Sequence, residues 1–191
     1  MNSSSDHLEI SIDDLIEKNG IWFKKYSRKP FTGCAVDYHD NGQLFARVKL
    51  KNGKLHGLHE EYYDYDGQLK SKGNYKDGGR DGVWEYYWDD GQLGLRENFK
   101  NGKENGLCEN YHENGQLESK RNYKDGELHG PNEWFYDNGQ LQSKENYKDD
   151  KKDGLFEQYY ENGQLQSKEN FKDGERDGLR ETYNKKRSIM I

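Results

Sequence analysis

The chain has 191 residues, of which 30% are hydrophobic and 35% are charged, and its mean hydropathy is −1.41. A chain this polar cannot fill the interior of a two-layer globular domain of the same length. Aromatic residues make up 14% and are regularly spaced, which argues against disorder because disordered chains are poor in aromatics. The composition therefore favours an extended fold that needs no thick core.

The net charge of −6 argues against a nucleic-acid groove as the main surface, and it suits a basic protein partner without requiring one. No stretch approaches the roughly 18 apolar residues of a membrane span. The first residues lack the basic and apolar regions of a secretory signal. Cys34 and Cys108 lie too far apart in the chain for a disulfide in a linear array, and their scarcity suits a reducing compartment. We therefore expect a cytoplasmic protein.

The N-terminal segment differs from the rest of the chain. Residues 1–19 are expected to form a tail, disordered over residues 1–7, followed over Ser11–Glu17 by either a short capped helix or a strand. In the helical alternative, Ser11 is the N-cap and Asp14 is the third helical residue. Residues 20–32 are expected to form a capping strand, with its extended part over Gly20–Tyr26. This segment would cover the first edge of the array, because an unpaired sheet edge invites aggregation.

Residues 33–184 are a tandem array of six full repeats and a partial seventh, each of about 24 residues. The motif Gly-Gln-Leu recurs through this region, beginning at Gly42, Gly67, Gly91, Gly115, Gly139 and Gly163. A second series opens the repeats at Gly33, Gly57, Gly82, Gly106, Gly130, Gly154 and Gly178. Residues 185–191 then form a C-terminal cap or tail.

Each repeat contains two runs of strand length separated by turns. Asn-Gly or Asp-Gly joins the two runs, and this dipeptide is typical of a type I′ hairpin turn. Lys-Asp-Gly or a close relative links one hairpin to the next. The runs are too short and too strongly bounded by glycine for helices. The sequence therefore predicts an all-β fold, an elongated single-layer antiparallel meander of tandem β-hairpin repeats with about 14 strands.

Two hairpin registers are compatible with this pattern. A two-residue turn at Asn162-Gly163 places Glu157 opposite Lys168, and the same count gives opposite charges in other repeats. Those pairs are Glu133 with Lys144, Glu109 with Lys120, Glu85 with Arg96, and Glu61 with Lys72. A three-residue loop with a bulge would instead place Leu165, Tyr159 and Leu155 on one face. We favour the register that pairs the charges.

The pattern Gly-x-x-x-x-Tyr-x-x-Asn-Gly-Gln-Leu followed by Tyr-Lys-Asp-Gly resembles the variant class of MORN repeats over about Phe31 to Tyr183. Together with the lead-in Lys-Pro-Phe-Thr-Gly, it is also similar to the YwqK-type antitoxins of bacterial toxin–antitoxin systems. That resemblance implies a protein that binds and neutralises a partner toxin.

Comparison of the repeats separates constant from variable positions. The fifth residue after the opening glycine is always aromatic, and the third is glutamate in six of seven repeats. The second and fourth residues vary freely and share one face of the strand with the sixth. The candidate partner-binding residues on this face are Trp84, Tyr86, Trp88, Trp134, Tyr136, Phe156, Tyr160, His59 and His112. Exposed Trp and Tyr are common interface anchors, and the alternative is that these aromatics simply pack the sheet.

Two columns of basic residues run along the second strands. One contains Arg47, Lys72, Arg96, Lys120, Lys144 and Lys168, and the other contains Lys51, Lys76, Lys100, Lys124, Lys148 and Lys172. They could meet anionic lipid headgroups, but neutralisation by the glutamate column is the favoured interpretation. The six histidines are scattered and no catalytic arrangement, metal site or cofactor motif is present. We therefore expect a non-enzymatic binding protein for a protein partner, with a structural or peripheral-membrane scaffold as the alternative.

Overall fold

The computed structural model describes residues 9–185. The predicted disorder of residues 1–7 and most of the predicted C-terminal cap or tail, residues 185–191, concern residues outside this range. Residue contacts divide the chain into two units, Met1–Leu93 with Phe99–Lys103 and Gly94–Asn98 with Glu104–Ile191. The boundary between the units runs along strand β9, and each unit is described by itself.

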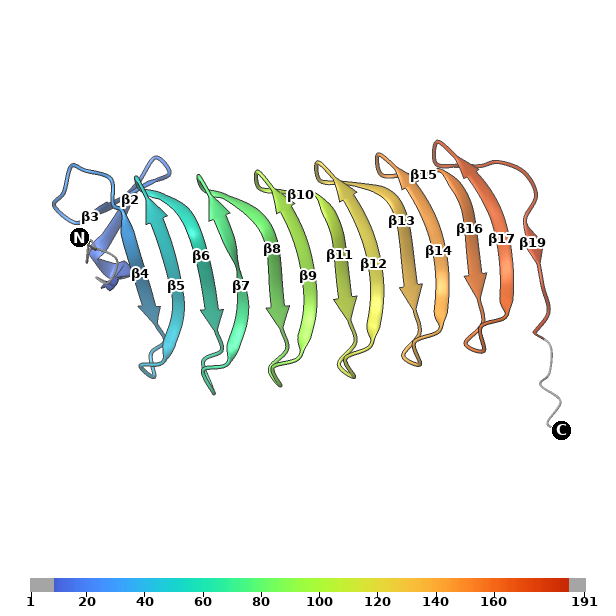
Figure 1. The fold of residues 1–191 in the computed structure, drawn as a ribbon, viewed down its shortest axis with the longest axis horizontal. Helices are drawn as coiled ribbons and strands as arrows, with labels where there is room; N and C mark the ends of the chain where they lie inside the picture. The colour runs from blue at the N-terminus through green and yellow to red at the C-terminus, as the bar shows by residue number, and fades with distance from the viewer. Residues whose placement is uncertain (1–8, 186–191) are drawn as a thin grey trace, which may run out of the picture. The chain divides into compact units, whose positions relative to one another are not determined.

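The first unit contains a small N-terminal sheet element and the first repeats (Figure 1). Its elements are β1 (Glu9–Ser11), η1 (Ile12–Asp14), β2 (Leu15–Lys18), β3 (Ile21–Lys24), β4 (Gly33–Tyr38), β5 (Leu44–Lys51), β6 (Lys54–Tyr62), β7 (Leu69–Lys76), β8 (Gly79–Tyr87) and the ends of β9 (Leu93–Lys100). From β4 to β8 each strand pairs antiparallel with the next.

The second unit continues the same pattern. Its elements are β10 (Lys103–Glu104, which begins in the first unit), β11 (Gly106–Tyr111), β12 (Leu117–Lys124), β13 (Glu127–Phe135), β14 (Leu141–Lys148), β15 (Lys151–Lys152), β16 (Gly154–Tyr159), β17 (Leu165–Lys172), β18 (Glu175–Arg176) and β19 (Glu181–Thr182). The short strands β10, β15 and β18 are followed, after one or a few residues, by β11, β16 and β19. Each such pair occupies the place that a single strand takes in the earlier repeats.

The predicted fold class is confirmed: the described residues form a nearly all-β, mostly antiparallel meander of hairpin repeats, with 17 strands in its main sheet. Counting the three interrupted strands once each gives the expected number of about 14. Within each unit the repeats form one layer. Because a single layer buries little apolar surface, this fold agrees with the low hydrophobic content.

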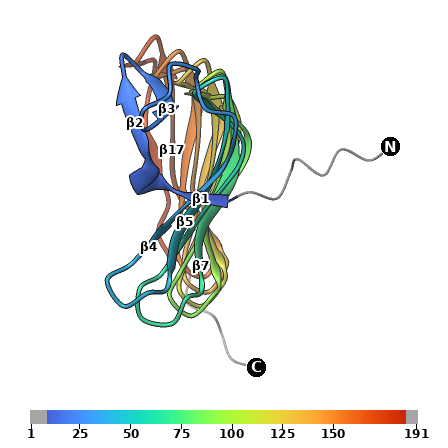
Figure 2. The same cartoon turned by 90° about the vertical axis from the view of Figure 1, so that its left-hand side faces the viewer.

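The N-terminal segment covers the first edge of the array. Strand β1 pairs parallel with β4, with Ile10 opposite Ala35, and β2 and β3 form a separate hairpin that lies beside the sheet (Figure 2). The helical alternative for Ser11–Glu17 was wrong beyond one 3-10 turn, because Ser11 Oγ accepts from Asp13 N at 3.2 Å and Leu15 already begins a strand. The expected extended part over Gly20–Tyr26 narrows to β3, which pairs with β2. The prediction of a capping strand within residues 20–32 was therefore wrong, because β1 pairs with β4 instead. The buried cluster beneath this segment consists of Leu15, Ala35, Val48 and Leu50, with Ile10, Ile12, Trp22, Phe31 and Leu55 packed against it.

The turn expected to be type I′ has another geometry, and the linking turns adopt type I′ instead. The linking turn at Asp125-Gly126 has φ of +54° and +93°, as a type I′ turn requires. In the hairpin turn at Asn162-Gly163 only the glycine has a positive φ, of +76°. This turn is closed by Gly163 N donating to Tyr160 O at 2.8 Å and Tyr160 N donating to Gln164 O at 2.9 Å. The prediction of type I′ geometry at Asn-Gly was therefore wrong, and the linking turns have it instead.

The longer hairpin turn reconciles the two registers. Tyr159 lies opposite Leu165, as the bulged loop requires, and a bulge then restores Gln158 opposite Ser167 and Glu157 opposite Lys168. The charge pairs Glu133–Lys144 and Glu109–Lys120 are also directly opposite.

The prediction that Glu61 lies opposite Lys72 was wrong. Lys72 lies opposite Glu60, because the turn between β6 and β7 is one residue longer than the others. In that turn Tyr63 N donates to Gln68 O, five residues on, where the other turns span four.

Candidate functional site

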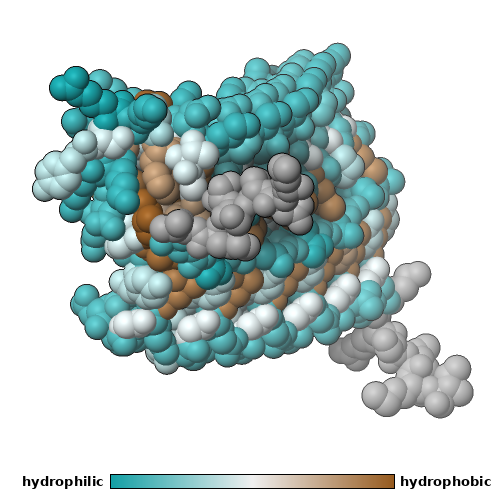
Figure 3. Space-filling view, turned by 60° about the vertical axis from the view of Figure 1, so that its left-hand side comes forward, coloured by the Kyte–Doolittle hydropathy of each residue, from teal (hydrophilic) through white to brown (hydrophobic). Residues whose placement is uncertain are grey.

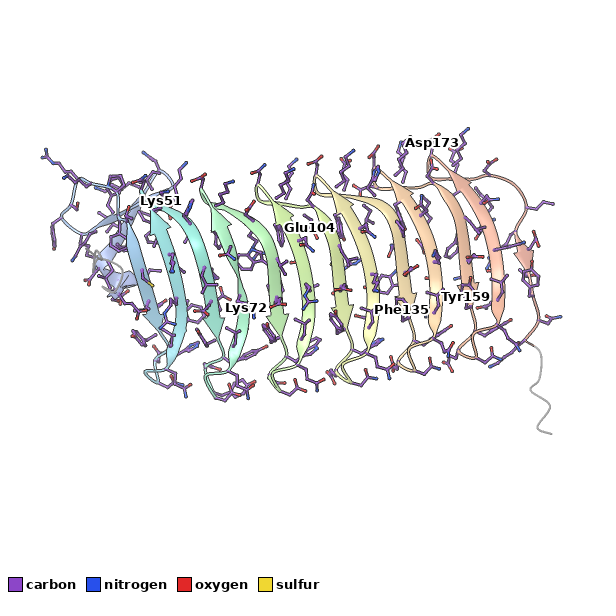
Figure 4. All side chains as sticks on the ribbon, viewed as in Figure 1. Lys51, Lys72, Glu104, Phe135, Tyr159 and Asp173 are labelled. Carbon is purple, nitrogen blue, oxygen red and sulfur yellow. The ribbon has the colours of Figure 1, made fainter. Side chains whose placement is uncertain are left out.

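The sheet presents two chemically different faces. The variable face carries the second and fourth residues after each opening glycine, and the constant face carries the third and fifth. On the face seen in Figure 3, hydrophobic residues lie in narrow bands between hydrophilic ones and do not gather in one broad patch. Figure 4 shows Phe135 and Tyr159, both on the constant face, at the hairpin-turn ends of their strands. Lys51 and Asp173 lie at the opposite, linking-turn ends of theirs.

The variable face of the first unit is built around Trp84, which is only 1% exposed. Its indole Nε1 donates to Asn74 O at 3.1 Å. Its ring lies 5.1 Å from Tyr75 and 5.5 Å from His59, measured between centroids. An exposed anchor was expected here, and that expectation was wrong, because the indole fills the space that Gly73 leaves on the neighbouring strand. At this residue the packing alternative is correct.

Arg80 completes this aromatic cluster and was missed by the sequence comparison. Its guanidinium lies 4.4 Å from the ring centroid of Trp84 and 5.2 Å from that of Phe99, and its Nη1 donates to Tyr86 Oη at 2.7 Å. Cation–π contacts of this kind stabilise a partly desolvated charge. Because Arg80 precedes the opening glycine of its repeat, an alignment that starts at that glycine does not include it.

His59 extends the cluster towards a carboxylate. Its Nε2 lies 3.1 Å from Glu61 Oε1. The hydrogen bond from His59 lowers the pKa of the Glu61 carboxyl, against the opposing effect of its burial. His59 and Tyr86 are therefore half-buried members of a packed cluster whose outer edge faces solvent.

In the second unit the position of Trp84 is taken by Cys108 and Asn132 in the next two repeats. Arg121 lies directly across the strands from both Cys108 and Asn132, and its Nη2 lies 3.6 Å from Cys108 Sγ. Burial raises the pKa of the Cys108 thiol, although Arg121 acts in the opposite direction. The guanidinium lies 6.0 Å from the ring centroid of Trp134, which is half-buried. Around Arg121, smaller side chains and a guanidinium thus occupy the space that the indole of Trp84 fills in the first unit.

Phe156 occupies the same column further along the second unit. Its ring centroid lies 6.2 Å from that of Phe171 and 4.4 Å from Lys152 Nζ. Lys152 is also 3.3 Å from Glu145 Oε2. Partial burial and the hydrogen bond to Glu145 raise the pKa of Tyr147, which lies beside this pair. Phe156 therefore stacks with a cation and an aromatic from its neighbours and is half-buried.

The sixth-position residues lie in the hairpin turns, just beyond the strand ends, and most of them connect one repeat to the next. Tyr136 Oη donates to Tyr159 O at 2.8 Å, and Tyr160 Oη donates to Tyr183 O at 3.1 Å. His112 Nε2 lies 3.4 Å from Phe135 O. These three candidate residues therefore hold adjacent turns together. Trp88, in the equivalent position, is 40% exposed and is the most accessible of the nine candidates.

On the constant face, charges neutralise one another. Lys72 Nζ lies 3.0 Å from Glu85 Oε2, and Lys144 Nζ lies 2.9 Å from Glu133 Oε1. Arg47, Arg96 and Lys168 make similar contacts to glutamates of the following repeat. The interpretation of the first basic column as the counterpart of the glutamate column is therefore correct. The second column, at the linking turns, is exposed at every position: Lys51, Lys76, Lys100, Lys124, Lys148 and Lys172.

Within residues 9–185, no group of three or more His, Cys, Asp or Glu residues is arranged to hold a metal ion. In the same part of the chain, no helix has the length and apolar character needed to cross a membrane. What the geometry offers is a half-buried, chemically varied face on a regular hairpin repeat.

Comparison with known proteins is consistent with this architecture. The family model described as MORN repeat variant matches five segments, residues 55–77, 80–101, 104–125, 128–149 and 152–173. No curated protein matches the sequence.

Two solved structures have weak similarity to the chain. One is a GtfA/B complex bound to UDP and GlcNAc, with 16% identity over 74% of this chain and a TM-score of 0.24. The other is accessory secretory protein 1, 2 and 3 in Streptococcus pneumoniae, with 17% identity over 78% of this chain and a TM-score of 0.20. The chain spans 24% and 21% of those two chains. At such TM-scores neither likeness bears on function.

Proposed function

This chain belongs to the MORN repeat variant family, and we propose that it is an antitoxin- or immunity-type protein that neutralises a toxin by binding it through the variable face. Repeats of this family indicate a scaffold for protein or membrane association. The proposal assigns no catalytic step and no cofactor to the chain, and it places the protein in the bacterial cytoplasm.

The contrast between the two faces carries this proposal. The constant face repeats one glutamate–aromatic–lysine arrangement in almost every hairpin. The variable face changes from Trp84 to Cys108, Asn132 and Phe156 at a single structural position. Packing alone would be satisfied by one residue type repeated, as it is on the constant face. A fixed scaffold with one diversified face is how repeat proteins present a binding surface.

Adjacent residues on β13 provide the test. Trp134 belongs to the variable face and Phe135 to the constant face, and both are half-buried. We expect Trp134→Ala to weaken partner binding by more than about 2 kcal/mol, the scale of an interface hot spot, while Phe135→Ala leaves it unchanged. Circular dichroism and thermal melts would show that both variants keep the sheet.

The partner would first be isolated by tagged pull-down and mass spectrometry, then expressed alone and together with this chain. A single stoichiometric partner that is toxic alone and harmless with the wild-type chain supports the proposal, provided that Trp134→Ala loses the protection. If the partner is harmless alone, the antitoxin function is wrong. If both variants bind as the wild type does, the variable face is not the binding surface.

The exposed lysines at the linking turns favour a second candidate, a scaffold that associates with anionic membrane surfaces. Sedimentation with phosphatidylserine-containing vesicles tests it, because binding through these lysines should be lost at high salt. Failure to pellet at low ionic strength would remove this candidate.

A further inference from the structure

Two hairpin turns of the first unit depart from the repeat pattern at the same position. The residue before the turn glycine is asparagine at Asn41, Asn114, Asn138 and Asn162, but aspartate at Asp66 and Asp90. Both aspartates keep the local role of the asparagine: Gln68 N donates to Asp66 Oδ1 at 2.9 Å, and Gln92 N donates to Asp90 Oδ1 at 2.8 Å. The turn geometry therefore does not require the change to a charged residue.

The asparagines make a second bond that aspartate cannot make. The Nδ2 groups of Asn114 and Asn138 donate to Asp137 O and Glu161 O, each at 3.1 Å, and Asn41 Nδ2 donates to Asp64 O. Each bond ties a turn to the next one. A carboxylate has no proton to donate at neutral pH, so Asp66 and Asp90 replace a donor with a negative charge. In its own turn Asp90 Oδ2 accepts from Gln92 Nε2 at 2.8 Å, but this bond does not replace the tie to the next turn.

The same two turns expose aromatic side chains. The turn between β6 and β7 is one residue longer than the other hairpin turns, and its Tyr65 is 57% exposed. The rings of Tyr63 and Tyr65 lie 5.6 Å apart between centroids, and Trp88 in the following turn is 40% exposed. Exposed aromatics grouped in this way on a loop edge are typical of interaction sites.

The charge around these rings is strongly negative. Asp64, Asp66, Asp89 and Asp90 all belong to the two turns. Partial burial and the nearby carboxylates of Asp89 and Asp66, one from each turn, raise the pKa of Tyr63. The chain's own Lys70 places its Nζ 5.7 Å from the centroid of Tyr63. The ring of Tyr63 thus already accepts an ammonium group.

Contacts within the chain fix these two turns relative to each other. Tyr63 Oη donates to Tyr87 O at 2.7 Å, which joins the two turns. Gln68 packs against the next turn so closely that a Cβ at Gly91 would lie 2.8 Å from Gln68 Oε1. A site ordered in advance loses less conformational entropy on binding.

We propose that this edge, formed by Tyr63, Tyr65, Asp66, Trp88, Asp89 and Asp90, binds a lysine- and arginine-rich segment of a protein partner. Aromatic faces and carboxylates together recognise ammonium and guanidinium groups through cation–π and charge-assisted contacts. This surface lies at the hairpin turns. It shares Trp88 with the nine candidate residues but includes none of the strand positions of the variable face. It rests on the proposed function only in that the partner is a protein.

A labelled twelve-residue peptide of alternating lysine and serine provides the probe, measured by fluorescence anisotropy with the full chain. We expect Asp66→Asn with Asp90→Asn to weaken binding roughly tenfold. These substitutions restore the residue that four other turns carry, so the fold should persist. The matched control, Glu113→Gln with Glu161→Gln, removes the same charge from turns of the second unit and should change affinity by less than about twofold.

Equal losses in the two double variants would mean general attraction to an acidic protein, and the proposal would be wrong. It would also be wrong if Asp66→Asn with Asp90→Asn bound the peptide as tightly as the wild type. Trp88→Ser, which leaves the charge unchanged, should weaken binding about threefold through loss of the aromatic surface. Because Trp134→Ala should not affect this peptide, failure here is distinguishable from failure of the variable face.

Discussion

At the scale of single residues, the packing of the first unit depends on a glycine without unusual backbone geometry. Gly73 lies directly opposite His59, and an added Cβ would lie 2.2 Å from the indole of Trp84. The equivalent position in later repeats carries the side chains of Arg121, Glu145 and Glu169. The glycine and the tryptophan therefore form one complementary pair.

We expect Gly73→Ala to destabilise the protein by about 1–3 kcal/mol, the cost of overpacking a filled site. Urea denaturation would measure this change. Adding Trp84→Leu should recover part of the loss, because the smaller side chain leaves space for the methyl group. Lys72→Ala, the neighbouring residue on the constant face, is the control and should cost less than about 1 kcal/mol. If Gly73→Ala is neutral, the indole is free to move and Trp84 is not fixed by its neighbours.

The exposure of Trp84 could not have been predicted from its own repeat. The alternation of side chains along the strand correctly places Trp84 and Tyr86 on one face, as their shared contacts with Arg80 show. Whether a residue on that face is covered depends on the neighbouring strand, where glycine replaces a larger residue. Since that neighbour lies in the preceding repeat, aligning equivalent positions hides the complementarity.

At the scale of the hairpin, side chains in the turns connect successive repeats. The sixth-position tyrosines donate to a carbonyl of the next repeat, and the turn asparagines do the same. The glutamine of Gly-Gln-Leu packs against the next turn glycine, so that a Cβ at Gly139 or Gly163 would lie 2.8 or 2.9 Å from its Oε1. The recurrence of Gly-Gln-Leu is therefore explained by contacts between repeats as well as by the geometry of the turn.

Tyr136→Phe tests this coupling without changing the shape of the side chain. It removes the donor to Tyr159 O and should destabilise the protein by about 0.5–1.5 kcal/mol, the usual net value of a hydrogen bond. Thermal unfolding followed by circular dichroism would detect it. Tyr38→Phe, at a tyrosine that is 55% exposed, serves as control and should melt as the wild type does. Identical melting of both variants would show that the tyrosine bonds add nothing to the coupling.

Glycine spacing was sufficient to predict the hairpins, their number and most of the register, because positive φ recurs at fixed intervals. It did not predict which turn adopts which type. Asn-Gly and Asp-Gly fit either geometry, and the choice depends on loop length and on the bond from Gln164 N to Asn162 Oδ1, measured at 3.2 Å. The one-residue insertion between β6 and β7 then shifts a register that is otherwise regular, so the count from Gly67 misassigned Glu61.

At the scale of the whole chain, the two units bury different kinds of side chain. Among the described residues, the buried hydrophobic ones in the first unit are Leu15, Ala35, Val36, Ala46, Val48, Leu50 and Trp84. The first unit buries one polar residue, Ser71, whereas the second unit buries Cys108 together with five polar ones, Ser119, Asn132, Ser143, Ser167 and Glu169. Burying apolar surface contributes about 25 cal/mol per Å², whereas a buried polar group must first recover the cost of leaving water. The backbone ladders are alike, so burial should decide the difference in local stability.

We therefore expect native-state hydrogen exchange to be slower in β5–β7 than in β13–β16, by at least roughly tenfold in protection factor. Mass spectrometry of peptic peptides would resolve these segments, and their similar antiparallel pairing makes each the reference for the other. Val48→Ala removes buried surface from a residue that is 6% exposed and should lower protection in β4–β6. Protection in β14–β17 should not change, because stability in repeat proteins is largely local. Equal protection in the two wild-type segments would mean that the backbone ladder, and not side-chain burial, determines the stability of this fold.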